Sequence, residues 1–120
     1  MGSKQLHDEI NNNLEQRLRN SPVDYGLIVK EQEYHYNGLH GEIDLYAVKT
    51  LRHKDGTLMK RYVLSFETKS RDNYHYKSKA RTQLKKSKKY LTRMYNPNCF
   101  RAFYNTRHKI KRVWLKNENK

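Results

Sequence analysis

The feature that most constrains this chain is a pair of apolar segments flanking the turn sequence Lys54-Asp55-Gly56. Residues 43–51 alternate between two faces, whereas residues 58–69 contain the consecutive apolar run Tyr62-Val63-Leu64. A Gly-containing turn between two such segments predicts a β-hairpin. Because the second segment is apolar at neighbouring positions, we expect it to be buried on both faces, like a central strand.

Two carboxylates and a lysine lie on this predicted hairpin. Asp44 follows Ile43 in the first strand, and Glu67 and Lys69 end the second strand, where they share one face. If the strands separate here, the two carboxylates can converge, and a hard divalent cation such as Mg²⁺ or Mn²⁺ would relieve their repulsion. Such an ion polarises a phosphoryl oxygen and activates water, while a nearby ammonium stabilises developing charge or orients the water. The pattern indicates metal-dependent cleavage of a phosphodiester, although an isolated Glu-x-Lys is more often a solvated charge pair.

The charge is distributed very unevenly along the chain. Residues 1–72 contain 11 Lys or Arg and 11 Asp or Glu, whereas residues 73–117 contain 14 Lys or Arg and no acid. A solvated surface normally mixes the two signs, so the second region is typical of a surface that binds a polyanion. We expect nucleic acid, and an anionic membrane surface is the competing interpretation.

The remaining pattern predicts one α+β domain over residues 1–120, in the order α-β-β-β-α-β-β. We expect a first helix over residues 4–19, capped by Ser3, with Leu6, Ile10, Leu14 and Leu18 on one stripe. The other expected elements are strands over 24–36, 43–51 and 58–69, a helix over 76–95, and strands over 99–104 and 110–115. Asn37-Gly38 predicts a turn, and we expect residues 116–120 to be disordered.

Several classes of protein are disfavoured by the sequence. There is no run of 18 apolar residues and no signal-peptide pattern, so we expect no membrane span and a cytoplasmic protein. The single Cys99 cannot form an internal disulfide, which favours a reducing compartment. With 120 residues the core is small, and by analogy with similar small domains we expect a homodimer, which would also bring two sites to two strands.

The second predicted helix would carry the polyanion-binding cations. They are Lys77, Lys79, Arg81, Lys85, Lys86 and Lys89. Tyr74, Tyr76, Tyr90 and Tyr95 lie among them and would either pack at the edge of the core or stack on unpaired bases. His40, next to Gly41, is a further candidate for an auxiliary acid or a phosphate contact. Phosphate contacts of this kind position a nucleic acid without reading its sequence.

The segments Gly41-Glu42-Ile43-Asp44-Leu45 and Leu64-Ser65-Phe66-Glu67-Thr68-Lys69 resemble the core of the PD-(D/E)xK nuclease superfamily. This superfamily includes restriction endonucleases, RecB-type nuclease domains and Holliday junction resolvases, and the first segment is closest to its YraN-like branch. The resemblance covers residues 9–91 and implies a restriction endonuclease-like fold, with a mixed central sheet between flanking helices. Ile43 stands where the Pro of the motif would be.

The resemblance also implies roles for individual residues. Asp44 and Glu67 would be metal ligands, together with the carbonyl of Thr68, and Lys69 would be the catalytic lysine. Many members place a Gln and then a Tyr in the following helix, which Gln83 and Tyr90 match, so Gln83 would be a further catalytic residue. Many also place a Glu in the first helix, which would complete the metal site; Glu15 is the best candidate for this ligand and Glu9 the second.

The leading hypothesis is therefore an Mg²⁺- or Mn²⁺-dependent endo- or exodeoxyribonuclease that recognises DNA structure or backbone rather than sequence. One alternative is a nucleic-acid-binding module that keeps the fold without cutting. Another is a nuclease directed at RNA. Divalent-metal binding by the carboxylates would distinguish the nuclease from the non-cutting module. Matched DNA and RNA substrates would distinguish a deoxyribonuclease from a nuclease directed at RNA.

Overall fold

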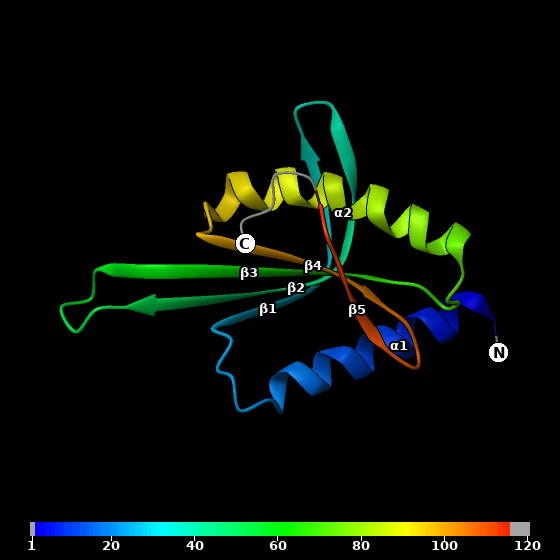
Figure 1. Cartoon of the computed structure of the whole chain (residues 1–120), viewed down its shortest axis with the longest axis horizontal. Helices are drawn as coiled ribbons and strands as arrows, with labels where there is room; N and C mark the ends of the chain where they lie inside the picture. Colours follow the sequence, from blue (N-terminus) through cyan, green and yellow to red (C-terminus); the bar gives the residue numbers. More distant parts are fainter. Residues whose placement is uncertain (1, 116–120) are drawn as a thin grey trace.

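The computed structural model describes residues 2–115; Met1 and the segment 116–120, where we expected disorder, lie outside this range. The elements in chain order are α1 (Ser3–Arg19), β1 (Leu27–Tyr36), β2 (Leu39–Arg52), β3 (Leu58–Thr68), α2 (Tyr74–Tyr95), β4 (Cys99–Asn105) and β5 (Ile110–Val113) (Figure 1). The predicted order α-β-β-β-α-β-β and the α+β class are confirmed.

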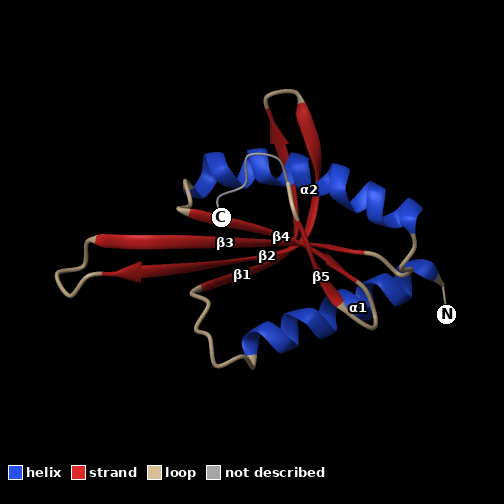
Figure 2. Ribbon diagram, viewed as in Figure 1, coloured by secondary structure: helices blue, strands red, loops and turns tan. Residues whose placement is uncertain are grey.

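The strands form a five-stranded mixed sheet in the order β1-β2-β3-β4-β5. The first three strands form an antiparallel meander, β4 lies parallel to β3, and β5 is antiparallel to β4. The parallel pair requires a crossover, and α2 provides it. Figure 2 shows α1 and α2 on opposite sides of the sheet.

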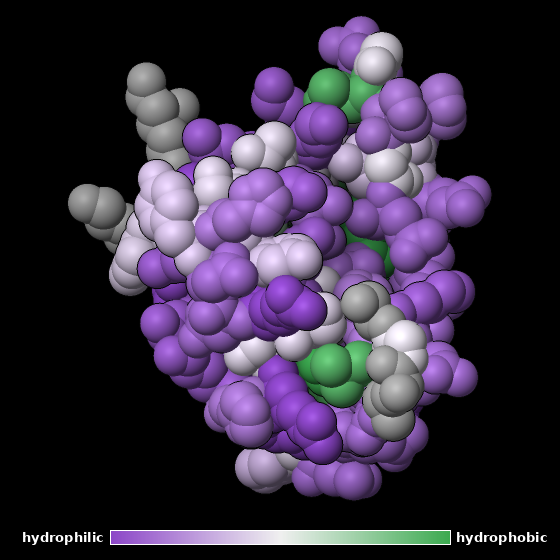
Figure 3. Space-filling model, turned by 90° about the vertical axis from the view of Figure 1, so that its right-hand side faces the viewer, coloured by the Kyte–Doolittle hydropathy of each residue, from purple (hydrophilic) through white to green (hydrophobic). Residues whose placement is uncertain are grey.

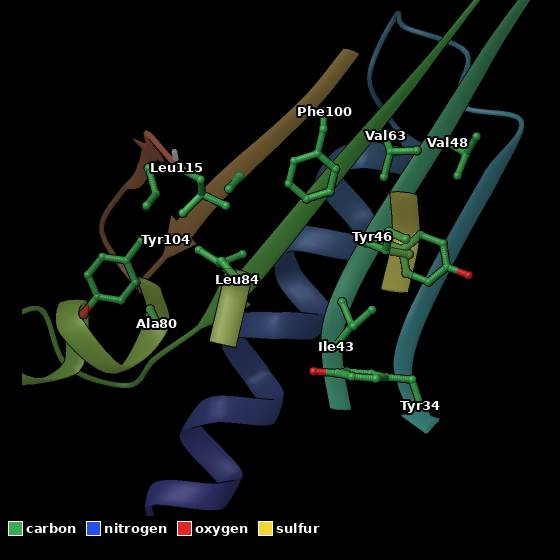
Figure 4. Packing of buried hydrophobic residues seen from close by; sticks show 13 residues of the cluster. Tyr34, Ile43, Tyr46, Val48, Val63, Ala80, Leu84, Phe100, Tyr104 and Leu115 are labelled. Carbon is green, nitrogen blue, oxygen red and sulfur yellow. The ribbon is translucent and has the colours of Figure 1, made fainter. Parts of the chain in front are cut away.

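Each helix covers a separate apolar cluster. On the α2 side, Ala80, Leu84 and Leu91 of the helix pack on strand residues that include Val63 and Phe100 (Figure 4). On the α1 side the buried cluster is smaller and consists of Leu14, Leu45 and Phe66. The β3 strand contributes to both clusters, which confirms its predicted burial on both faces.

The helix ends differ slightly from the predicted ones. Ser3 is already helical, and Gly2 occupies the N-cap position, where its backbone N–H donates to Gln5 Oε1 at 3.1 Å. The prediction that Ser3 caps this helix is therefore wrong. In α2, Asn73 Oδ1 accepts a hydrogen bond from Tyr76 N at 3.0 Å, so the helix begins at Tyr74 instead of Tyr76.

The strand ends also differ from the predicted ones, because pairing extends some strands and shortens others. Asn37 (φ 51°) and Gly38 (φ 80°) form the predicted turn, and β2 begins directly after it at Leu39. At the other end of the sheet, β5 stops at Val113, two residues before the predicted end.

No helix within residues 2–115 is long and apolar enough to cross a bilayer. The face of the molecule seen in Figure 3 is mainly hydrophilic, with only scattered hydrophobic residues.

Candidate active site

The β2–β3 ladder opens where the two predicted carboxylates lie. Its last pair at this end is Leu45 with Phe66, so the next residues, Asp44 and Glu67, are no longer held together by ladder hydrogen bonds. The adjoining strand β1 is irregular at the same level, because Glu31, opposite Asp44, has φ 57°. This opening lets two carboxyl groups occupy space that backbone pairing fills elsewhere in the sheet.

Asp44 is 5% exposed and is fixed from two directions. Its Oδ2 accepts a hydrogen bond from the backbone N–H of Thr68 at 2.7 Å, which bridges the opened strands through a side chain. The same oxygen lies 3.4 Å from His7 Nε2 on α1. Asp44 is therefore held at the junction of α1, β2 and β3.

A buried polar network on the α1 side supports this junction. Asn11, 1% exposed, donates from Nδ2 to the Asp44 carbonyl at 2.8 Å and accepts from Thr68 Oγ1 at 2.8 Å. Thr68 Oγ1 in turn accepts from Asn105 Nδ2 at 3.1 Å, and the Asn105 carbonyl accepts from Lys69 N at 2.9 Å. The network joins α1 to three strands and fixes the backbone on both sides of the opening.

Glu67 lies on the other side of β3 from the Thr68 side chain, because neighbouring strand residues alternate. It is 2% exposed, and its Oε1 lies 3.8 Å from Lys69 Nζ. Its second oxygen, Oε2, is buried and has no hydrogen-bond partner. A buried acceptor without a partner is costly, so this oxygen marks a position where a ligand would be stabilising.

The two carboxyl groups have opposite pKa shifts. Burial and the neighbouring Asp44 raise the pKa of Glu67 well above its usual range, and Lys69 only partly opposes this. Burial also disfavours ionised Asp44, but hydrogen bonds with His7 and the Thr68 N–H hold the Asp44 pKa below its usual value. The pair therefore carries negative charge more readily on Asp44 than on Glu67.

Further titratable groups surround the pair. The hydrogen bond to Asp44 raises the pKa of His7 despite the opposing effect of burial. Burial, and then the charges of Asp44, Glu31 and Glu33, raise the pKa of Glu42. These shifts show that acidic side chains are gathered at the opening, where each one disfavours ionisation of its neighbours.

The other residues predicted for the site are not all brought to it. Glu15 pairs with Arg19 (Nη2–Oε2 3.0 Å) and with Lys30 (Nζ–Oε1 3.3 Å), so its contacts lie at the boundary between α1 and β1. Glu9 is exposed beside the Asn105–Arg107 segment. The helix residues that contact Asp44 are instead His7 and Asn11, which the sequence analysis missed.

Gln83 and the tyrosines of α2 have identifiable environments. Gln83 is half-buried, and its Oε1 is a second buried acceptor without a hydrogen-bond partner. Tyr90 stacks on Tyr34 with ring centroids 5.0 Å apart, and Tyr95 shares a hydroxyl hydrogen bond of 2.7 Å with Tyr46. These two tyrosines, like Tyr76, pack against the core, whereas Tyr74 is 87% exposed.

His40 stacks on His35 across the β1–β2 hairpin, with ring centroids 5.4 Å apart. Gly41, next to it, allows a close approach of the Tyr34 side chain. A Cβ at this position would lie 2.9 Å from the Tyr34 hydroxyl oxygen. The Tyr34 ring thus packs directly over the backbone that leads to Asp44.

Most of the predicted binding cations are solvent-exposed on α2. These are Lys77, Lys79, Lys85, Lys86 and Lys89. Arg81 is half-buried and donates from Nη1 to the Trp114 carbonyl, which ties α2 to the segment after β5. Because α2 begins five residues after Lys69, these cations continue directly from the carboxylate pair along the chain.

The residues at the opening fit a hard divalent cation. Within residues 2–115, no group of three or more His, Cys, Asp or Glu side chains is arranged to hold a metal. Asp44 and Glu67 would therefore need the Thr68 carbonyl and water to complete a coordination shell. Mg²⁺ typically retains several waters and takes only one or two carboxylates, and the partnerless Glu67 Oε2 supplies a ready oxygen.

Comparisons with known proteins assign this chain to no family. No protein-family model matches the chain, and neither the curated proteins nor the solved structures include a significant match.

Proposed function

We propose that this protein is a metal-dependent nuclease of the PD-(D/E)xK type, with a restriction endonuclease-like fold, that hydrolyses phosphodiester bonds in DNA. The observation that carries the proposal is the buried carboxylate pair at the opened ladder, with one oxygen of Glu67 lacking any partner. Buried acceptors are normally satisfied within the protein, so the Glu67 oxygen without a partner supports a cation bound at this pair.

Asp44, Glu67 and the Thr68 carbonyl would hold Mg²⁺ or Mn²⁺, which when bound supplies Lewis-acid polarisation of the phosphoryl oxygen and acidifies a coordinated water. The chain's own contribution is the placement of Asp44 and Thr68 by the Asn11 network. Lys69 Nζ, near Glu67, would stabilise the negative charge that develops on the phosphorane-like transition state.

The exposed lysines of α2 would bind the sugar–phosphate backbone. Their contacts are electrostatic and carry no sequence information, so recognition would depend on the structure or the ends of the DNA. Binding would weaken steeply as salt concentration rises, because each neutralised phosphate releases counterions.

The experiment that tests the proposal is cleavage of labelled linear, branched and single-stranded DNA in Mg²⁺, Mn²⁺ or EDTA. Asp44→Ala and Glu67→Ala should each reduce the cleavage rate by on the order of 10²–10³-fold or more while DNA binding persists. Asp24→Ala, which removes an exposed carboxylate from a loop, is the matched control and should cleave normally.

Metal-independent cleavage, or full activity in both carboxylate variants, would contradict the proposal. Tight binding without products in any metal would instead support the non-cutting module on the same fold. Parallel assays with RNA of the same sequence distinguish the third function, because an RNA-directed enzyme would prefer the RNA substrate.

A further inference from the structure

The β2–β3 hairpin extends beyond the rest of the sheet. The last residue of β2 that pairs with β1 is Val48, and β4 first pairs with β3 at Tyr62. Residues 49–61, which we call the distal ribbon, therefore form a two-stranded structure without a lateral neighbour strand among the described residues. Figure 1 shows it projecting from one end of the molecule, past β1 and β4.

The distal ribbon is rigidly attached at its base. Arg61 N donates to Asn98 Oδ1 at 2.7 Å, and Asn98 N donates to the Arg61 carbonyl at 2.9 Å. The Arg61 guanidinium also donates to the Tyr95 carbonyl at the end of α2, at 2.9 Å. An isolated two-stranded ribbon is only marginally stable, so this bracing is what holds it in a fixed direction.

The tip of the ribbon is also well defined. Gly56 has φ 90°, and Asp55 Oδ1 accepts from Thr57 N at 2.9 Å and from Thr57 Oγ1 at 2.6 Å. Arg52 Nη1 donates to the Gly56 carbonyl at 3.0 Å. The single acidic side chain of the ribbon is thus used to form its turn.

The rest of the ribbon surface is cationic, with two apolar residues near its tip. The cations are Lys49, Arg52, Lys54, Lys60 and Arg61. Leu58 and Met59 are 45% and 51% exposed. Lysines on edge strands also prevent sheet-to-sheet association, so it is the charge together with the projecting shape of the ribbon that indicates a partner.

The dimensions and charge of the ribbon match a groove of duplex DNA. The major groove of B-form DNA is about 12 Å wide and admits a two-stranded β-ribbon, with cations able to reach phosphates on both sides. The major groove of A-form RNA is too narrow and deep for side chains to read. The charge and shape of the ribbon therefore favour B-form DNA over duplex RNA.

The ribbon lies at a defined distance from the carboxylate pair. Arg52 is eight residues beyond Asp44 on the same strand, which corresponds to about 26 Å at 3.3 Å per residue. At about 3.4 Å per base pair, this span equals about eight base pairs of duplex. One DNA molecule can thus contact both sites.

We propose that the distal ribbon is a second DNA-binding element that enters the major groove of B-form duplex about eight base pairs from the carboxylate pair. The duplex-binding part of this inference stands on the ribbon alone. The part that makes the bound duplex the substrate rests on the proposed nuclease function.

The test is equilibrium binding in EDTA, where cleavage plays no role, by wild-type protein and by Lys54→Gln/Lys60→Gln. The matched control is Lys4→Gln/Arg17→Gln, which removes the same charge from exposed positions on α1. Each protein is titrated with 20-base-pair DNA, with the corresponding RNA duplex and with single-stranded DNA, at several salt concentrations. Thermal melting confirms that each variant is folded.

The ribbon variant should bind duplex DNA on the order of tenfold more weakly than wild type, with a salt slope smaller by about 1.8, because two phosphate contacts are lost. Its affinity for duplex RNA and single-stranded DNA should fall no further than that of the α1 control. An equal loss on all three ligands, an equal loss in the control, or unchanged binding to duplex DNA would overturn the inference. Because binding is measured without metal, the ribbon inference can fail while the cleavage assay succeeds. Cleavage can likewise fail while the ribbon inference holds.

Discussion

The two faces of the sheet differ in what they bury. The face under α2 holds thirteen buried cluster residues, almost all apolar, whereas the face under α1 has only three buried hydrophobic cluster residues beside a polar network built on Asn11 and Thr68. Apolar burial is the main source of stability, whereas a satisfied polar network mainly fixes geometry. The comparison teaches that α2 contributes most of the apolar burial, whereas α1 positions Asp44 and Thr68 of the candidate site.

The largest expected effect is on stability and comes from the α2 side. Leu84, fully buried, should cost about 2–5 kcal/mol when changed to Ala, because the change leaves a cavity under α2. Half-buried Leu18, on α1, should cost less than half of that when changed to Ala. Chemical denaturation of both variants measures the difference, and equal losses would show that the two faces contribute alike.

The next effect is on cleavage and comes from the α1 side. Asn11→Ala should slow cleavage on the order of 10²-fold, because Asp44 and Thr68 lose their common hydrogen-bonding partner and a small displacement of catalytic groups is costly. Ser87→Ala is the control, since Ser87 is an equally buried polar residue on α2. Single-turnover rates measure the effect, and a rate loss in Ser87→Ala equal to that in Asn11→Ala would contradict the division between the faces.

A third prediction concerns the buried charge of Glu67. The pKa of Glu67 is higher in the folded protein than in the unfolded chain. The metal-free protein therefore loses stability as the pH rises from the ordinary pKa of a glutamate through the raised pKa of Glu67. Glu67→Gln lacks this loss, so in EDTA it should be more stable than wild type by about 1–3 kcal/mol above the raised pKa and no more stable at low pH.

Thermal melting across pH in EDTA tests this prediction, with exposed Glu33→Gln as the control. Added Mg²⁺ should stabilise the wild type and leave Glu67→Gln unchanged, because a ligand that binds only the folded state raises its stability. A wild-type melting temperature that is insensitive to Mg²⁺ would argue against a metal at this pair.

The smallest expected effect separates two residues of the same helix. Glu15→Ala breaks ion pairs with Arg19 and Lys30 that lie near the surface, so it should cost about 1 kcal/mol or less and leave Mg²⁺ binding unchanged. Calorimetric titration with Mg²⁺ measures the metal affinity. A clear loss of affinity would show that the first-helix glutamate is a ligand after all, despite its ion pairs.

The parts of the fold that depend on local pattern were predictable from the sequence. The turns at Asn37-Gly38 and Lys54-Asp55-Gly56 determine which strands are neighbours. The resulting pairing of β2 with β3 brings Asp44 near Glu67. We assumed from the sequence that the strands separate near Asp44 and Glu67, but could not predict that pairing ends at Leu45. No local signal in either strand specifies where pairing stops.

The supporting network could not be predicted in the same way. Asn11 stands in an Asn11-Asn12-Asn13 run, which reads as a solvent-exposed helix surface, and only the contact with β2 and β3 singles out the first of the three. The predicted apolar stripe, with steps of four residues from Leu6 to Leu18, also left Asn11 out of the buried face. His7 and Asn11 continue the Leu14–Leu18 face toward the N-terminus, at the 3.6-residue period of a helix, with polar residues in place of apolar ones.

The Asn105 contact has a consequence for the order in which the chain becomes competent. The strands β1, β2 and β3 are joined by short turns, so they can pair as soon as they exist, and both carboxylates then lie at the opening. Thr68 is fully clamped only when β4 docks beside β3, and all of α2 separates these strands in the chain. Pairing across such a long separation is slow. We therefore expect the geometry of the candidate site to be among the last parts of the domain to form, so that a nascent or partly unfolded chain contains both carboxylates before Thr68 is fixed.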